Sequence, residues 1–362
     1  MLIDIIAGAR PNFMKIAPII SAIKQAAAAG KNISYRLIHT GQHYDKKMSG
    51  DFFEQLGIPE PDINLEAGGG TQAEQTGAIM VRYEKVLLEK RPDMVLVVGD
   101  VTSTMACSIA AKKLNNIPVA HVEAGIRSGD LTMPEEINRM VTDAITDYFF
   151  TTSETANDNL RKAGTPDSRI FFVGNTMIDT LLTQMPNFKK PAIWDSIGLQ
   201  PKEYIVMTLH RPANVDEEDG LRKLMKAIVD SSKGLPLVFP VHPRTAKMLQ
   251  SVGINAPNLH MIDPLGYLEF NYLVQHAKAV VTDSGGITEE TTVMGVPCMT
   301  LRNNTERPET CTIGTNELLG TNPTAIPPAF KKLLNGEWKK GNIPELWDGK
   351  TAHRIVDTLL NI

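Results

Sequence analysis

The sequence contains little cysteine and no long apolar run, and both shortages exclude whole classes of protein. Its 362 residues include 3 cysteines, Cys107, Cys298 and Cys311, and no two of them form a C-x-x-C pair. Such a set provides neither a disulfide framework nor a zinc ribbon, and it is typical of a protein of the reducing cytoplasm. No apolar run approaches the length of a membrane span. The run at the N-terminus, MLIDIIAGARP, is too short for a signal peptide and lacks its basic start.

Motifs for bound metals and cofactors are also missing. The 8 histidines are scattered, without an H-E-x-x-H or H-x-H cluster, so we expect no metal. The chain has no P-loop, no G-x-S-x-G elbow and no clear G-x-G-x-x-G, so we expect no cofactor. The net charge of −4 argues against a nucleic acid or a membrane surface as the main partner. These exclusions leave a soluble globular protein with 42% hydrophobic and 22% charged residues.

The pattern of apolar runs predicts an α/β protein with two domains. A chain of 362 residues is too long for one typical core. Short runs rich in Val and Ile, such as MVLVVGD and AVVTDSG, alternate with amphipathic stretches of helical length, such as TMACSIAAKKL. This alternation is typical of parallel sheets covered by helices on both faces. The Pro-rich stretch at 177–201 interrupts the rhythm. We therefore expect two doubly wound Rossmann-like domains, the first covering residues 1–176.

Unusual polar residues follow the ends of several predicted strands. Parallel sheets bind ligands outside the carboxyl ends of their strands, so we expect these residues to share a cleft. They are Arg10 with Lys15, Asp100, Glu123, His210, His242 and Ser284. Each has an ordinary alternative: Asp100 could cap a helix, and Arg10 could bind carbonyl groups at a helix end. A carboxylate at Glu123, on an apolar strand beside Gly125, is harder to explain because an unpaired buried carboxylate is costly.

Three further features have both a structural and a chemical interpretation. Glu135 and Glu136 follow Pro134, where acidic residues complement the positive end of a helix dipole. The turn Ser284-Gly285-Gly286 is either an ordinary tight turn or an anion site at a helix N-terminus. The charged stretch TERPET is either a solvated loop or a place where Arg307 binds phosphate.

Many motifs in this chain occur in one family, in the same order. They are GARPNFMKIAP, TGQHYD, VVGDVTST, HVEAGIRSGDLTMPEEINR, VGNTMIDTL, TLHRPANV, PVHPR, DSGGITEE and RNNTERPE. On these motifs the chain resembles the non-hydrolysing UDP-N-acetylglucosamine 2-epimerases over nearly its whole length. The resemblance implies two Rossmann-like domains that face each other across a cleft, as in GT-B glycosyltransferases. It implies a UDP-binding domain over residues 177–349 and a last helix, 350–362, that packs back on the first domain.

The resemblance also implies an activity and a role for each site residue. The family interconverts UDP-N-acetylglucosamine and UDP-N-acetylmannosamine for cell-surface polysaccharide precursors, and we expect a cytoplasmic homodimer. Asp100, Glu123 and Glu135 would be catalytic acids and bases, and His210 would assist at the leaving phosphate. Lys15 would be a further residue of the cleft. The UDP would be held by Arg10, His242, Phe270 (stacked on uracil), Ser284, Gly285, Gly286 and Glu290 (on the ribose).

The chain departs from the family pattern in ways that leave its substrate open. Pro212 and Ala213 stand where relatives carry a carboxylate after the His-Arg pair. The form TGQHYD differs from the TAQHR form that is linked to allosteric control by the substrate. Together with SGDLTMPEE it is similar to relatives that act on UDP-2,3-diacetamido-glucuronic acid. An epimerase of that sugar is therefore one alternative, and a GT-B glycosyltransferase or a binding module without chemistry is another.

Overall fold

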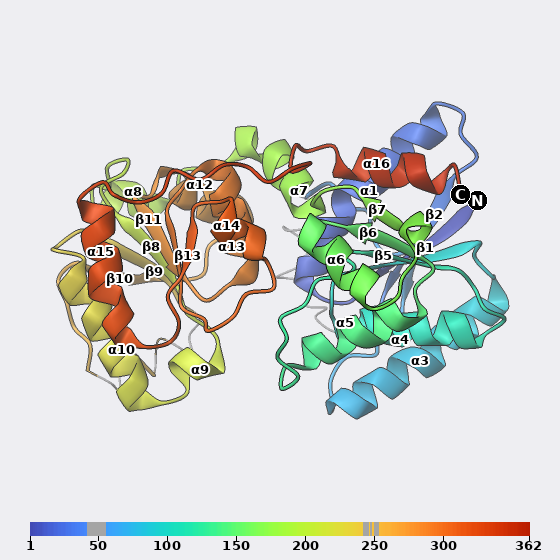
Figure 1. The fold of residues 1–362 in the computed structure, drawn as a ribbon, viewed down its shortest axis with the longest axis horizontal. Coiled ribbons are helices and arrows are strands. Elements are labelled where there is room, and N and C mark those ends of the chain that lie inside the picture. Colours follow the sequence, from blue (N-terminus) through green and yellow to red (C-terminus); the bar gives the residue numbers. More distant parts are fainter. Residues whose placement is uncertain (42–55, 242–245, 247, 250–252) are drawn as a thin grey trace. The chain divides into compact units, whose positions relative to one another are not determined.

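Two separate parallel sheets are formed by the short apolar runs of the sequence (Figure 1). The structure is a computed structural model, and it describes residues 1–41, 56–241, 246, 248–249 and 253–362. Each sheet belongs to its own compact unit. The N-terminal unit comprises Met1–Thr183 with Glu345–Ile362, and the C-terminal unit comprises Gln184–Pro344. The prediction of two doubly wound α/β domains is confirmed.

The N-terminal unit is built on seven parallel strands in the order β3-β2-β1-β4-β5-β6-β7. The strands are β1 (Leu2–Ala7), β2 (Ser34–His39), β3 (Ile63–Asn64), β4 (Met94–Val98), β5 (Val119–Val122), β6 (Tyr148–Thr151) and β7 (Ile170–Phe172). The central strand β4 is buried along its whole length, because helices cover both faces of the sheet. These helices are α1 (Arg10–Ala28), α3 (Gln72–Glu89), α4 (Thr102–Lys113), α5 (Pro134–Ile145), α6 (Glu154–Lys162), α7 (Thr176–Gln184) and α16 (Thr351–Leu359).

The C-terminal unit has six strands in the order β10-β9-β8-β11-β12-β13. They are β8 (Ile205–Thr208), β9 (Leu237–Pro240), β10 (Leu259–Ile262), β11 (Ala279–Thr282), β12 (Cys298–Thr300) and β13 (Asn316–Leu318). Its helices are α8 (Ala192–Ser196), α9 (Pro212–Val215), α10 (Glu218–Ser231), α12 (Tyr267–His276), α13 (Gly285–Met294), α14 (Pro308–Thr312) and α15 (Ile326–Leu334). The core packs apolar strand faces against α10 and α15.

Each sheet has one point at which the strand order reverses. In the N-terminal unit it lies between β1 and β4, and in the C-terminal unit it lies between β8 and β11. Open parallel sheets bind ligands at such a switch point, outside the carboxyl ends of the strands. We therefore expect the functional residues in the segments that follow these four strands.

The N-terminal unit ends at Thr183 and resumes at Glu345, so it contains most of α7. Thr180 on α7 donates to Met14 O of α1 at 2.5 Å. The carboxylate of Asp179 accepts from the backbone amides of Thr351 and Ala352 at 3.1 and 2.7 Å, and so caps α16. Helix α16 packs against α1 in this unit (Figure 1).

Among the helices in the described part of the chain, none combines the length and the apolar character that crossing a bilayer requires. Nor do the described residues contain a group of three or more His, Cys, Asp and Glu side chains that could hold a metal ion.

Candidate active site

The end of β1 and the start of α1 are tied to the end of β4. Asn12 accepts from the amides of Gly8 and Ala9 at 3.1 and 3.0 Å and donates to Val98 O at 3.0 Å. Lys15 follows one turn later on α1, close to the end of β4. Arg10 begins α1, but its side chain lies outside the part of the structure that is described, so its predicted contact with UDP remains a prediction.

Lys15 and Glu123 form a buried ion pair at this switch point. Lys15 Nζ lies 2.7 Å from Glu123 Oε2, and the two side chains are 9% and 3% exposed. Gly99 lies directly beneath the pair: a Cβ atom on it would lie 3.0 Å from Lys15 Nζ and 3.7 Å from Glu123 Oε2. The backbone there is left-handed, with φ of +68° at both Gly99 and Glu123. A left-handed Glu is uncommon and costs on the order of 1 kcal/mol or more, as strained residues at functional sites often do.

Asp100 follows Gly99 and is held by α5. Its carboxylate accepts from Arg139 at 2.5 Å, and its backbone carbonyl accepts from Asn138 at 2.8 Å. The side chain of Asp100 is 26% exposed, so a ligand can reach it. The structure thus places Lys15, Glu123 and Asp100 around one glycine.

Glu135 and Glu136 begin α5 but differ in their surroundings. Glu135 is exposed at the first turn of α5. Glu136 is buried and accepts from the amides of Ser128 and Gly129 at 2.9 and 3.0 Å and from Arg139 at 2.7 Å. Burial alone would raise the pKa of Glu136, but these donors outweigh it and lower the pKa. Glu136 anchors the loop before α5, whereas Glu135 is free to meet solvent or a ligand.

Sequence reasoning missed the inner face of α5 as a support for the site. Glu136, Arg139 and Asp143 recur at i, i+3 and i+7, so they share one face of the helix. Asp143 binds His121 of β5 at 2.7 Å. This spacing of charges was visible in the sequence, but the partners of each charge were not.

In the C-terminal unit, His210 and Asp283 meet where β8 and β11 end. His210 Nδ1 lies 2.7 Å from Asp283 Oδ1, and Asp283 also accepts from the amides of His210 and Arg211. Burial alone would raise the pKa of Asp283, but its hydrogen bond and charge interaction with His210 dominate and lower it. His210 is 61% exposed, so the carboxylate orients the ring and leaves Nε2 toward solvent.

Ser284 is the N-cap residue of α13, and Gly285 begins the helix. A Cβ atom on Gly285 would lie 3.1 Å from Glu306 Oε1 and 3.6 Å from an Arg302 nitrogen, so close packing is one reason for glycine there. The first turn of α13 also has free backbone amides, and such amides at a helix N-terminus attract anions. Phosphate binding by Ser284, Gly285 and Gly286 remains a prediction.

Glu290 is buried on α13, and its Oε1 accepts from the hydroxyl of Tyr267 at 2.9 Å. Burial raises the pKa of Glu290 to about 7, and the charge of Glu289 adds to this. Phe270 stands one turn after Tyr267 on α12 and packs, half-buried, against the core of the unit. Roles on ribose for Glu290 and on uracil for Phe270 remain predictions.

Arg307 is bound by two carboxylates. Its Nε lies 2.5 Å from Glu289 Oε1, and its NH1 lies 3.5 Å from Glu306 Oε1. Arg302 binds the other oxygen of Glu306 at 2.6 Å. The predicted binding of a phosphate by Arg307 stays a prediction, and the ion pairs give the arginine a structural role. His242, which was predicted to hold UDP, lies outside the described residues.

Comparisons with known proteins agree on one family. Residues 25–360 match the family model described as UDP-N-acetylglucosamine 2-epimerase. A UDP-N-acetylglucosamine 2-epimerase of Methanocaldococcus jannaschii is 41% identical over 99% of each chain. A UDP-2,3-diacetamido-2,3-dideoxy-D-glucuronate 2-epimerase of Pseudomonas aeruginosa is also 41% identical, over 100% of each chain.

Solved structures support the same assignment. The crystal structure of the Methanocaldococcus jannaschii UDP-GlcNAc 2-epimerase in complex with UDP-GlcNAc and UDP has a TM-score of 0.87, 40% identity and 100% coverage of each chain. A lipopolysaccharide outer core galactosyltransferase, 14% identical with a TM-score of 0.58 over 100% of this chain and 99% of its own, shares the fold alone.

Proposed function

Because the chain belongs to the UDP-N-acetylglucosamine 2-epimerase family, and is therefore a UDP-sugar 2-epimerase, we propose that it interconverts UDP-N-acetylglucosamine and UDP-N-acetylmannosamine. The observation that carries the reaction type is the group of Lys15, Glu123 and Asp100 around Gly99, at the switch point of the N-terminal sheet. Proton transfer needs positioned acids and bases, and this group supplies two carboxylates and a cation.

The reaction begins by expelling UDP from carbon 1 of the sugar. The bond between carbon 1 and the phosphate oxygen breaks, and its electron pair leaves with UDP. Carbon 1 gains cationic character, so the proton on carbon 2 becomes acidic and a carboxylate removes it, which leaves 2-acetamidoglucal. UDP then adds back to carbon 1 while a proton is delivered to the opposite face of carbon 2. One proton leaves from one face of the sugar and another arrives at the opposite face. The site therefore needs acid–base groups on both faces, which several carboxylates supply.

Each group has a proposed part in these steps. Asp100, Glu123 and Glu135 transfer the protons, and Lys15 keeps Glu123 in place through the buried ion pair. His210, oriented by Asp283, donates at the leaving phosphate.

Binding of the UDP is proposed for the residues that the family resemblance implies. Arg10, His242 and the first turn of α13 at Ser284, Gly285 and Gly286 hold the diphosphate. Glu290 holds the ribose and Phe270 stacks on the uracil.

The second candidate substrate is UDP-2,3-diacetamido-2,3-dideoxy-glucuronic acid. The relative that acts on it is as similar to this chain as the first-named relative, at 41% identity for both. Purified protein should be incubated with each UDP-sugar in heavy water and followed by NMR. Deuterium should appear at carbon 2 of the epimerised sugar, without added nicotinamide. Product without deuterium at carbon 2 would refute the elimination mechanism, and the faster of the two sugars identifies the substrate.

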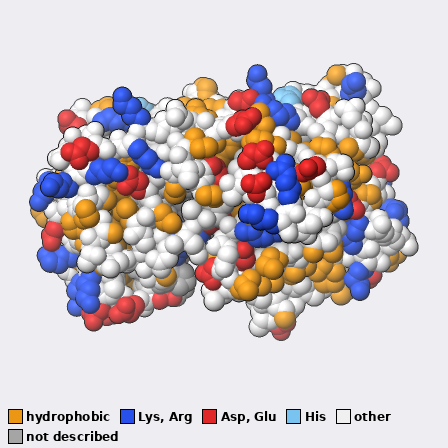
Figure 2. Space-filling view, in the orientation of Figure 1, with side chains coloured by type: hydrophobic (Ala, Val, Ile, Leu, Met, Phe, Trp, Pro, Cys, Tyr) orange, Lys and Arg blue, Asp and Glu red, His pale blue; other side chains and the backbone are white. Residues whose placement is uncertain are grey.

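We also propose that the protein is a cytoplasmic homodimer and that it supplies precursors of polysaccharides. Val81 and Leu88 on α3 are 58% and 68% exposed, and Ile137 and Met140 on α5 are 43% and 46% exposed. Figure 2 shows hydrophobic side chains gathered on the surface over α4 and α5. Such a patch is typical of an interaction surface. Analytical ultracentrifugation of the wild type and of an Ile137→Glu, Met140→Glu variant tests it, and a wild type that sediments as a monomer at micromolar concentration would exclude the dimer.

A further inference from the structure

His121 lies fully buried in β5, and each of its ring nitrogens faces an oxygen that requires a donor. Nε2 lies 2.8 Å from Gly99 O, and Nδ1 lies 2.7 Å from Asp143 Oδ1. A carbonyl oxygen and an ionised carboxylate can only accept hydrogen bonds. His121 therefore bridges the carbonyl of Gly99 and the carboxylate of Asp143 through its two ring nitrogens.

Asp143 is bound from both sides. Its Oδ2 accepts from the amide of Gly125 at 3.0 Å and lies 2.7 Å from Arg127 NH1. Burial alone would raise the pKa of Asp143, but His121 and then Arg127 outweigh burial and lower it, so the carboxylate is ionised. Arg127 also donates to Ile126 O at 2.8 Å, so its guanidinium group is held by the backbone of its own loop. We name His121, Asp143 and Arg127 the His121 network.

The His121 network ends on the two turns that carry the proposed catalytic carboxylates. His121 holds the carbonyl of Gly99, the residue before Asp100. Asp143 holds the amide of Gly125, two residues after Glu123. Both turns are left-handed, with φ of +68° at Gly99 and Glu123 and +77° at Gly125. The two glycines adopt this conformation without strain, whereas the left-handed Glu123 persists only where its surroundings hold it.

We infer that the His121 network is a positioning device, which holds the turns at Gly99 and Glu123 so that the carboxylates of Asp100 and Glu123 stand ready for proton transfer. The inference rests on the proposed function, and none of the three residues is assigned a contact with the substrate. A misplacement of a catalytic group by about 1 Å can cost about 10²-fold in rate. The network should therefore govern kcat more than KM.

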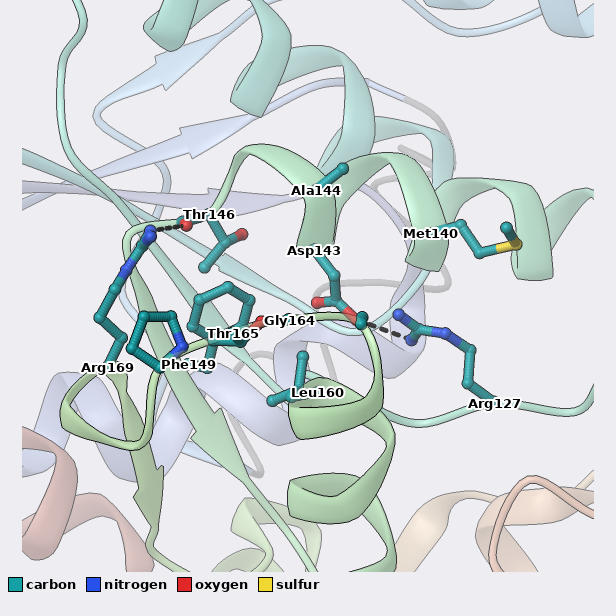
Figure 3. A pocket seen from close by; sticks show the side chains of 12 residues that line it. Arg127, Met140, Asp143, Ala144, Thr146, Phe149, Leu160, Gly164, Thr165 and Arg169 are labelled. Carbon is teal, nitrogen blue, oxygen red and sulfur yellow. Dashed lines mark hydrogen bonds and ion pairs between the residues drawn. The ribbon is translucent and has the colours of Figure 1, made fainter.

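The outer end of the His121 network opens into a cavity of about 370 Å³ (Figure 3). Arg127 and Asp143 line it together with apolar side chains such as Met140, Phe149 and Leu160. The cavity gives small solutes a route to the carboxylate of Asp143. A formate ion can therefore enter and replace that carboxylate when the side chain is shortened.

The experiment compares Asp143→Ala with Asp143→Asn. In Asp143→Asn the amide oxygen still accepts from Gly125 and Arg127, and the amide nitrogen donates to Nδ1 of His121. The hydrogen bonds survive, while Asp143→Ala loses them all. The matched control is Asp147→Ala, two residues beyond α5. Asp147 binds Lys112 at 2.9 Å and the amide of Val119 at 2.8 Å, at the other end of β5, and has no part in the His121 network.

We expect Asp143→Ala to lower kcat by about 10²-fold. KM for the UDP-sugar and the Kd for UDP should change less than about threefold, since these depend on uniform binding. Millimolar formate should restore part of kcat in Asp143→Ala, and Asp143→Asn should keep most of it. Asp147→Ala should lower the free energy of unfolding without a loss of kcat and without a response to formate.

Amide hydrogen exchange provides a readout that does not depend on activity. Peptides that contain Gly99–Asp100 and Glu123–Gly125 should exchange faster in Asp143→Ala than in the wild type or in Asp147→Ala. If the wild type epimerises neither UDP-sugar, the proposed function fails, while the exchange still reports on the turns. Unchanged exchange, or a kcat of folded Asp143→Ala within about threefold of the wild type, overturns the inference. Should Asp143→Ala not fold, Arg127→Met, which removes a partner of Asp143, replaces it, with the same expected results for kcat and exchange and the same overturning results.

Discussion

The ammonium group of Lys15 lies 2.7 Å from Oε2 of Glu123, and both side chains are almost completely buried. The pair joins helix α1 to the loop after β5 and lies against the backbone of Gly99. Burying one charge alone costs free energy, because the charge loses its contact with water. Two opposite charges that are buried as a pair offset much of that cost. The stability of the N-terminal unit and its proposed activity therefore depend on the same pair in different ways.

Removing one partner of this pair should destabilise the fold more than removing both. Lys15→Met leaves the carboxylate of Glu123 buried without its counter-charge, which should cost about 3–5 kcal/mol of unfolding free energy. The double variant Lys15→Met, Glu123→Gln should recover most of that loss but no epimerase activity. Urea denaturation and turnover measurements separate the two effects. Equal stability of the single and the double variant would contradict a coupled pair.

The proposed catalytic carboxylates should be needed for turnover, and those outside the buried pair, Asp100 and Glu135, should not be needed for folding. Asp100→Asn, Glu123→Gln and Glu135→Gln should each lower kcat by about 10²–10⁴-fold, the usual contribution of acid–base catalysis, because each amide keeps the shape of the carboxylate but cannot transfer a proton. Glu84→Gln, on the exposed side of α3, serves as a control that should turn over normally. Near-normal kcat in all three site variants would remove these residues from the mechanism.

The start of α13 should bind the diphosphate of UDP through its free amides. Gly286→Val places a branched side chain beside those amides and should raise the Kd for UDP by at least about tenfold, the effect of about 1.4 kcal/mol. Isothermal titration calorimetry measures it. Gly77→Val is the control, since a Cβ atom at the exposed Gly77 of α3 would point into open space. If Gly286→Val folds and binds UDP with wild-type affinity, the segment is an ordinary turn and not a diphosphate site.

Glu309 should make the stability of the protein depend on pH. It is buried on α14, where desolvation raises its pKa from 4.5 to about 7. A raised pKa means that the stabilising contribution is present below pH 4.5 and is lost as the pH rises through about 7. Glu309→Gln cannot ionise, so its stability relative to the wild type should increase by roughly 3 kcal/mol at most between pH 4.5 and pH 8.5.

Denaturation by urea at several pH values measures this difference. Glu203→Gln, at an exposed position, should follow the wild type at every pH. Parallel curves for Glu309→Gln and the wild type would show that the carboxyl group of Glu309 has an ordinary pKa.

The strands and their order of appearance could be predicted because they depend on local composition. The run MVLVV became β4 and the run AVVT became β11, each buried along its length. Apolar β-branched segments of this length can satisfy their backbone and bury both faces only inside a covered parallel sheet. The polar residues at the strand ends followed from the same rule, since parallel strands end at one edge.

The sequence by itself determined two doubly wound domains, the positions of the polar residues that leave their strands, and the family to which these motifs belong. Tertiary structure alone decided which charges meet. Lys15 pairs with Glu123 across 108 positions of the chain, and Arg307 pairs with Glu289 rather than remaining open. It also decided the left-handed backbone at Glu123 and the bridge that His121 makes between Gly99 and Asp143. The physical reason is that a buried charge is stable only beside a partner, and the packing of distant segments determines which partner is within reach.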